Sequence, residues 1–358
     1  MKIIPGYIRK KFVFIFLFLL ISIIIMFLII DLVENLDKFI DKKVTTNIII
    51  EYYLYYIPYI IVLIMPMVTL MATVFCISSF AKHNEIIAFK ALGMSMAQIM
   101  RTIIFMGIII SAGTFVIAEK LAIPANRKMF HIKEKYLENR YNQKTGTVRN
   151  IQLQEPPDKI VTIGYFDAEN SLAKNVTVET FKGNKIISRL DSPVMIWDGK
   201  EWTVKKGVQR IFDNENEILT KIKEPIKFHF NFTPKQIALS SLKPDEMNFS
   251  ELVRFIKRIR NSGGETYELL TDLHFRISFP FSNLVIVFFS IPLVYNRRQK
   301  SIAAGFGISL IVSFFYFGLV KTGQTMGHKG TANPVLAAWL GNLLMIASAV
   351  VFNIKARK

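Results

Sequence analysis

The feature that most constrains this chain is an almost unbroken apolar run near its start. Residues 12–30 consist nearly entirely of Phe, Leu, Ile and Val. At a rise of about 1.5 Å per residue, a helix of this length crosses a bilayer core about 30 Å thick. The run is too long for a signal peptide, and no small-residue cleavage site follows it. It therefore predicts a membrane anchor.

Five further segments have the length and the low charge of a membrane span. They lie at about residues 57–80, 99–123, 275–294, 302–324 and 334–353. Composition agrees, because 51% of the 358 residues are hydrophobic, more than one soluble core of this size needs. The single cysteine, Cys76, excludes an internal disulfide and a cysteine-cluster metal site.

Charge in the short loops predicts the orientation, because Lys and Arg are retained on the cytoplasmic face. Both termini, the connection at 81–98 and the segment at 297–300 are basic, and Glu85 is their only acid. Six spans with these loops inside place both termini in the cytoplasm. The net charge of +18 is then explained by basic loops that stay in the cytoplasm and contact lipid headgroups. Nucleic-acid binding is not indicated, since no base-reading motif is present.

Between the span regions 1–136 and 244–358, residues 137–243 alternate apolar and polar positions with turn residues between them. Strand-like runs lie at 159–166, 176–181, 185–190, 194–197, 202–204, 208–212 and 226–232. Hairpin turns are expected at 182–185 and 198–200, since Asn, Asp and Gly tolerate positive φ. This pattern predicts an all-β domain outside the cytoplasm, a sandwich, jelly roll or open barrel.

Aromatic residues in this domain leave two interpretations open. Phe228, Phe230 and Phe232 fall on one strand face, and Trp197 and Trp202 flank a tight turn. They either fill an ordinary β core or line a sheet face that is open to acyl chains.

A basic amphipathic helix is expected at 251–260. Its apolar stripe either lies on a membrane surface or packs against its own domain.

The connection at 81–98 reads as a short helix with its own stop signals. Asn84 is expected to cap its first turn and Gly93 to close its far end. Ser95 and Gln98 predict a capping box for the next span. Glu85 shares one helix face with Ala88, Phe89 and Leu92. This carboxylate either binds Lys82 or Arg101 of its own chain, or meets a cation on a partner ATPase.

Several segments together resemble one family. They are residues 84–95 (NEIIAFKALGMS), 197–202 (WDGKEW), 251–257 (ELVRFIK) with Ser262, Gly263, Tyr267 and Glu268 after them, and 337–340 (AAWL) after Asn333 and Pro334. Over nearly its whole length the chain resembles the LptF/LptG (YjgP/YjgQ) permeases of lipopolysaccharide export. The resemblance implies an inner-membrane protein with six transmembrane helices and a periplasmic, jelly-roll-like β domain between the third and fourth.

The resemblance also implies partners. An LptB ATPase dimer would use ATP and Mg, whereas this chain would hold no cofactor. A homologous LptF-type permease would pair with this chain. LptC and the LptA bridge would continue the periplasmic path. The coupling helix at about 84–93 would carry the contacts to the ATPase. Its candidate residues are Glu85, Ala88, Phe89, Ala91, Leu92 and Gly93.

LptG-type members often place lysines near the outer end of the first span to meet lipid phosphates. Here Asp31, Glu34 and Asp37 come first, and the stretch 31–40 favours LptG over LptF. The candidate phosphate ligands are Lys38, Lys42 and Lys43, with Arg127, Lys128 and Lys133 beyond the third span.

Catalysis by this chain is not expected. The glycines at 318 and 323 imitate a phosphate loop, but its lysine is replaced by Gln324 within a span, which favours helix packing. The five histidines lack metal-ligand spacing.

Two other functions remain as alternatives. An ion-coupled transporter would break its spans at Pro58, Pro66, Pro280 or Pro292, and an assembly scaffold would need only the β domain.

Overall fold

The computed structural model forms two compact units. It describes residues 3–137, 147–155, 158–167, 170–183, 185–213, 216–222, 224–230, 232–234, 237, 244–261, 265–295 and 302–356. The first unit consists of Met1–Leu137, Asn248–Leu252 and Thr266–Lys358, and the second of Glu138–Met247 and Val253–Glu265.

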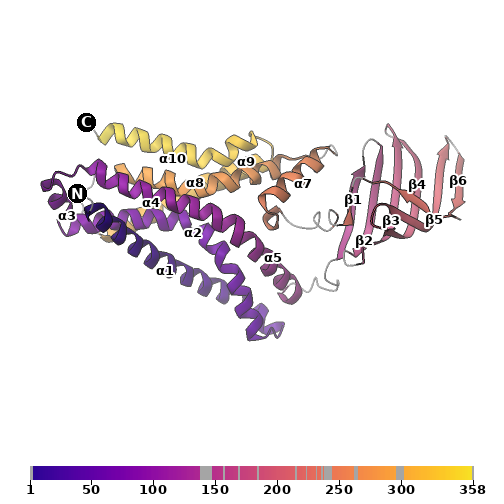
Figure 1. Ribbon diagram of the computed structural model, residues 1–358, viewed down its shortest axis with the longest axis horizontal. Coiled ribbons are helices and arrows are strands. Elements are labelled where there is room, and N and C mark those ends of the chain that lie inside the picture. The colour runs from indigo at the N-terminus through magenta and orange to yellow at the C-terminus, as the bar shows by residue number, and fades with distance from the viewer. Residues whose placement is uncertain are drawn as a thin grey trace. The chain divides into compact units, whose positions relative to one another are not determined.

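Six long apolar helices form the first unit, which confirms the predicted spans (Figure 1). They are α1 (Ile3–Asp41), α2 (Thr46–Lys82), α4 (Met96–Ile117), α8 (Tyr267–Tyr295), α9 (Ile302–His328) and α10 (Pro334–Ala356). Most of them extend past the apolar cores read from the sequence, because polar residues continue the helices beyond the apolar segment.

The third span continues beyond its apolar core as η1 (Ala118–Ala122), α5 (Ile123–Ile132) and η2 (Lys133–Leu137). The wider π turn of η1 lies just before Pro124, whose ring has no N–H and crowds the preceding turn of an α-helix. In contrast, α2 runs unbroken through Pro58 and Pro66, and α8 includes Pro280 and Pro292 without interruption. The helix breaks that an ion-coupled transporter would use are therefore not present in these two described helices.

Buried polar side chains tie the spans together. Asn283 of α8 accepts a hydrogen bond from Thr69 Oγ1 of α2 and donates one to Thr114 Oγ1 of α4, each 3.2 Å long. Asn342 of α10 accepts one from the Tyr316 hydroxyl of α9 at 3.1 Å. Hydrogen bonds of this kind hold helices together in lipid, where there is no hydrophobic driving force between them.

Close packing of α9 on α10 gives a testable prediction. A Cβ on Gly323 would lie 2.4 Å from the carbonyl oxygen of Ala337, whereas a Cβ on Gly318 would meet nothing within 4 Å. We expect Gly323→Ala to lower the free energy of unfolding by about 1–3 kcal/mol through overpacking. Gly318→Ala on the same helix is the matched control, because both changes raise helix propensity equally. Thermal unfolding in detergent measures both, and equal melting temperatures would contradict the packing role.

The second unit contains one antiparallel sheet, which confirms the predicted β domain. Its strands are β1 (Thr147–Glu155), β2 (Lys159–Asp167), β3 (Leu172–Lys182), β4 (Lys185–Trp197), β5 (Trp202–Asp213), β6 (Asn216–Lys221) and β7 (Ile226–Phe228). β1 to β6 follow one another in sequence order, and β7 pairs with β5. Among the described strands this order is a meander, without the Greek-key crossovers of a closed jelly roll.

Several strand boundaries differ from those read in the sequence. The runs at 185–190 and 194–197 are one strand, β4, and those at 202–204 and 208–212 are one strand, β5. The pairing of β4 with β5 shifts register between Asp191 and Val194, so Pro193 falls in an irregular stretch that needs no ladder N–H. The run at 226–232 is a strand only as far as Phe228, and β1 and β6 were not predicted.

The predicted turn between β4 and β5 is present. Gly199 has φ of +102°, and Asp198 Oδ1 accepts hydrogen bonds from the N–H groups of Lys200 at 3.0 Å and Glu201 at 2.8 Å. These bonds hold the pKa of Asp198 below its usual value. The turn at 182–185 includes residue 184, which lies outside the described residues, and Gly183 there has φ of +63°.

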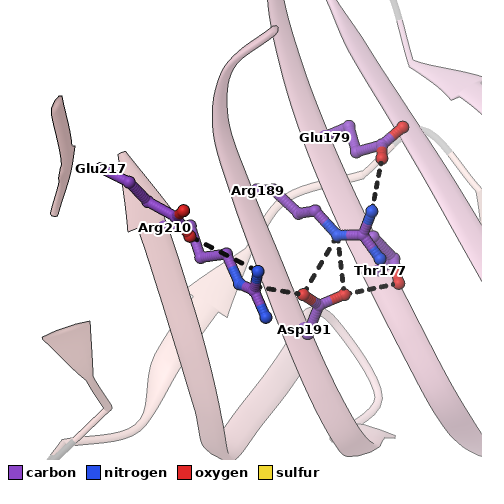
Figure 2. Close-up of polar contacts among 6 residues, drawn as sticks. All are labelled: Thr177, Glu179, Arg189, Asp191, Arg210 and Glu217. Atoms are coloured by element: carbon purple, nitrogen blue, oxygen red, sulfur yellow. Dashed lines mark hydrogen bonds and ion pairs between the residues drawn. The ribbon is translucent and has the colours of Figure 1, made fainter. Parts of the chain in front are cut away.

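Side chains on β3, β4, β5 and β6 form a ladder of hydrogen bonds and ion pairs that crosses the sheet from strand to strand (Figure 2). Arg189 Nε donates to both oxygens of Asp191 at 3.0 Å, and Thr177 donates to Asp191 at 2.9 Å. Arg210 continues the ladder to Glu217 at 3.4 Å. The apolar side chains of the sheet form a separate buried core that includes Val161, Ile163, Phe166, Val204 and Trp202.

Aromatic rings extend that core. Trp202 is fully buried, and its Nε1 donates to the carbonyl oxygen of Phe232 at 2.9 Å. The rings of Phe228, Phe230 and Phe232 stack with centroids 5.1 and 4.9 Å apart. Phe232 is buried, whereas Phe228 and Phe230 are only half-buried. Phe232 thus fills the core, while the half-buried rings of Phe228 and Phe230 leave part of an apolar surface open to the surroundings, which we call the aromatic margin.

The basic amphipathic helix is α7 (Phe249–Asn261), which follows the short helix η3 (Pro244–Glu246). Asn248 caps it, because its Oδ1 accepts from the Glu251 N–H at 2.9 Å and Glu251 returns a bond to the Asn248 N–H at 2.8 Å. Leu252 and Ile256 of its apolar stripe are buried within the protein. This burial favours packing against the chain over a position on a membrane surface.

Candidate functional site

The short helix between the second and third spans is α3 (Glu85–Ala91). Asn84 precedes it with φ of +56° and makes no side-chain capping bond, so the expected cap is wrong. Asn is instead suited to this position because it tolerates the left-handed conformation. Gly93 ends the helix as predicted, with φ of +79°. The Met94 N–H donates to the Phe89 carbonyl and the Gly93 N–H to Lys90, both at 2.9 Å, which is a Schellman motif.

The first turn of the following span also forms as predicted. Gln98 N–H donates to Ser95 Oγ at 3.3 Å, and Ser95 N–H donates to Gln98 Oε1 at 2.9 Å. This capping box begins α4 directly after the turn that ends α3. The position of α3 is therefore fixed to α4 by backbone geometry.

Glu85 forms an ion pair within the chain, but with neither of the two expected partners. Its Oε1 accepts a hydrogen bond from Lys11 Nζ of α1 at 2.8 Å. Both side chains are about one fifth exposed. Lys11 also lies over the Phe80 ring of α2, 4.6 Å from its centroid. The acid of α3 thus connects this helix to the first span rather than to Lys82 or Arg101.

Phe89 provides a second attachment on the same side of α3. It is buried, and its ring meets Phe80 edge-on at a centroid distance of 5.5 Å. Because Glu85 and Phe89 are one turn apart, a single helix face carries both the ion pair and the aromatic contact. That face is turned toward the chain's own spans.

Other apolar residues of α3, and Leu92 directly after it, are exposed. Ile87 is 67% exposed and Leu92 is 60% exposed, and Ala88 and Ala91 are exposed as well. We call these four residues the docking face. Ile87 on α3 and Leu92 at its C-cap are large, apolar and exposed, and Glu85 and Phe89 attach α3 to the spans. Such a surface is typical of one that a partner protein covers.

The predicted contacts to an ATPase were Glu85, Ala88, Phe89, Ala91, Leu92 and Gly93, and that role stays a prediction. In the structure Glu85 and Phe89 contact the chain's own α1 and α2, whereas Ile87, which was not among the candidates, is exposed. Spacing of i, i+1, i+4 and i+5 for residues 87, 88, 91 and 92 is a signal that could have identified the docking face.

The candidate phosphate ligands gather at one place, because the end of α1, the start of α2, and α5 with η2 share an apolar cluster that includes Phe39, Tyr52, Met129 and Ile132. The six basic candidates lie here: Lys38 on α1, Lys42 and Lys43 in the turn between α1 and α2, Arg127 and Lys128 on α5, and Lys133 on η2. The structure therefore brings together two groups that are far apart in the sequence.

These cations differ in their contacts. Lys38 donates to Asn35 at 3.0 Å, and Lys128 donates to the Tyr55 hydroxyl at 3.3 Å. Arg127 forms an ion pair with Glu251 of α7. Within the described ranges, Lys42, Lys43 and Lys133 have no carboxylate partner. Those three lysines are available to bind an anion.

A polar network that the sequence did not reveal lies beside this region. Glu119 in η1 accepts a hydrogen bond from the Phe249 N–H at 3.0 Å and pairs with Arg276 of α8 at 3.5 Å. Both charged side chains are about 15% exposed, at 16% and 14%. The network ties the start of α7 to the third and fourth spans.

The fold, the short helix α3 and the cluster of candidate phosphate ligands together define a class of protein. It is a multi-span membrane protein with an inserted β domain and an exposed helix between two spans. The chain belongs to the LptF/LptG family, described as lipopolysaccharide export system permease LptF/LptG, which matches residues 6–355. A comparison with curated proteins finds no match.

Family membership gives the protein its general role. It is a multi-pass inner-membrane permease of the lipopolysaccharide export system, a transport subunit rather than an enzyme. The match does not separate LptG from LptF, so the preference for LptG stays a prediction.

Proposed function

We propose that this permease is the membrane subunit of an ABC-type exporter, driven through α3 by a separate LptB ATPase dimer that uses ATP and Mg. The observation that carries the proposal is the docking face, which is exposed although it is apolar. Glu85 attaches α3 to α1, and Phe89 attaches it to α2. A push on α3 is thereby passed to two spans at once.

The proposal needs a motor because lipid extraction is uphill. Each methylene that leaves the bilayer costs about 0.8 kcal/mol, so a lipid with several acyl chains cannot leave unaided. In the proposed orientation, α3 and both termini lie in the cytoplasm and the β domain lies in the periplasm, as the basic loops indicate. A homologous LptF-type permease completes the shared cavity.

The cations beside α5 suit the lipid's phosphates. Lys42, Lys43 and Lys133, without carboxylate partners among the described residues, are the best placed of the six candidates. Lysine binds phosphate as a point charge and tolerates varied positions of the phosphate.

The aromatic margin of Phe228 and Phe230 offers acyl chains an apolar surface in the β domain. We place this domain before LptC and the LptA bridge in the path.

Gentle purification with identification of the co-purifying chains tests the proposal. We expect a nucleotide-binding subunit and a sister permease with the tagged protein. Leu92→Asp should reduce recovery of the ATPase about tenfold or more, because a charge would enter an apolar contact. Lys82→Gln, an exposed change outside the docking face, is the control. Full ATPase recovery with Leu92→Asp would contradict the role of this face.

A further inference from the structure

The starts of α1 and α4 lie at the end of the helical unit that carries α3 (Figure 1). Residues of these two helix starts line an open cavity of about 610 Å³. Its wall consists of Pro5, Arg9, Met94, Gln98, Arg101, Thr102 and Phe105. The volume lies within the usual range for small-molecule sites, about 300–1,000 Å³. None of these residues belongs to the docking face or to the candidate phosphate ligands.

Two guanidinium groups give the cavity its charge. In the part of the chain that the structure describes, neither Arg9 nor Arg101 pairs with a carboxylate. Glu85, the acid of α3, is already bound to Lys11. Two uncompensated arginines on one cavity favour an anion, and their planar donors match the oxygens of a phosphate.

Polar side chains near the arginines have free hydrogen-bonding capacity. Gln98 uses its Oε1 to accept from Ser95 N–H, which leaves its amide NH₂ as a donor. Thr102 donates its hydroxyl proton to the Gln98 carbonyl at 3.2 Å, so its oxygen remains an acceptor. A phosphate ester with a hydroxylated headgroup offers partners for both.

The remaining lining residues of the cavity, Pro5, Met94 and Phe105, are apolar. Phe105 is 51% exposed and follows Arg101 by one helical turn. Ile108 and Ile109, which are 49% and 50% exposed, lie one turn further along the same side of α4. A ligand with its phosphate between the arginines would thus find an exposed apolar stripe for a hydrocarbon chain.

We propose that this cavity binds one anionic phospholipid of the surrounding leaflet, with its phosphate at Arg9 and Arg101 and an acyl chain along Phe105. The lipid is a bound component rather than the exported cargo, so the inference goes beyond the proposed function. Met94 lines the cavity and also donates the hydrogen bond that closes α3. An occupied site therefore stabilises the turn between α3 and α4.

Photocrosslinking of the purified full-length chain tests the site. The chain is placed in phosphatidylcholine nanodiscs that contain a trace of phosphatidylglycerol with a diazirine on its acyl chain. We expect crosslinks on α4 near Phe105, and more of them than with a matched phosphatidylcholine probe. Each arginine should contribute about a fivefold preference, so Arg9→Gln with Arg101→Gln should remove most of the crosslinking. Lys10→Gln, an exposed neighbour that does not line the cavity, should leave it unchanged.

Several results would overturn the proposal. An equal loss with Lys10→Gln would indicate diffuse surface charge, and displacement of the probe by excess inorganic phosphate would assign the cavity to free phosphate. Unchanged crosslinking in the double variant, with lost recovery of the ATPase, would assign the cavity to a partner protein. ATPase recovery is measured in a separate purification. The crosslinking assay itself contains no ATPase, so a failure of the export proposal does not determine its outcome, and absence of wild-type crosslinks near Phe105 would overturn the site without any variant.

Discussion

Glu85→Lys is expected to lower lipid-stimulated ATP hydrolysis by the assembled complex about tenfold. The change places two ammonium groups where Lys11 and Glu85 now lie 2.8 Å apart, and α3 loses its connection to the first span. A hydrogen bond to a charged group contributes about 1.5–3 kcal/mol, and 1.4 kcal/mol corresponds to a factor of ten. Hydrolysis and lipid release are measured on the same preparation.

A charge exchange separates the ion pair from a direct contact with the ATPase. Lys11→Glu combined with Glu85→Lys restores opposite charges, and we expect it to recover a large part of the coupling. Recovery should be incomplete, since Glu at position 11 cannot interact with the Phe80 ring as a cation does. Normal coupling in both single variants would rule out the pair as the connection between α3 and α1.

Trp202→Ala is expected to destabilise the β domain by about 3–5 kcal/mol. The side chain is fully buried, contacts Phe166, Trp197 and Phe232, and donates to the Phe232 carbonyl. Its removal leaves a large cavity and breaks that hydrogen bond. Hydrogen exchange of β2 to β5 in the full-length chain should show the loss of protection.

Ile218→Ala supplies the matched control for that experiment. Ile218 is a large apolar residue of the same sheet, on β6, but it is 54% exposed. We expect its removal to change protection little. If both variants exchanged at the same rate, Trp202 would not be the centre of the domain core.

The existence of the spans and the two helix ends at Gly93 and Ser95 could be predicted because their signals are local. Hydropathy alone determines where a helix is stable in lipid, and the capping box of Ser95 and Gln98 needs only three residues of separation. Gly93 ended α3 as expected because its positive φ is a backbone requirement of that turn.

The predictions that failed involve weaker or distant signals. The β1 and β6 strands lie at the two ends of the sheet order, where a strand has one free edge and less reason for strict alternation. Lys11 and Glu85 are 74 residues apart, so no spacing rule connects them. Apolar residues surround the short helix α3, so its sequence does not show which side faces the spans; the packing of Phe89 on Phe80 shows it.

The most direct test of the central claim is lipid release from proteoliposomes that contain lipopolysaccharide. The chain is reconstituted alone, with its sister permease, and with both the permease and the ATPase. We predict transfer of lipid to a soluble acceptor only in the complete assembly and only with ATP, and loss of transfer with Leu92→Asp. Release by the purified chain alone, without ATPase or ATP, would contradict the account.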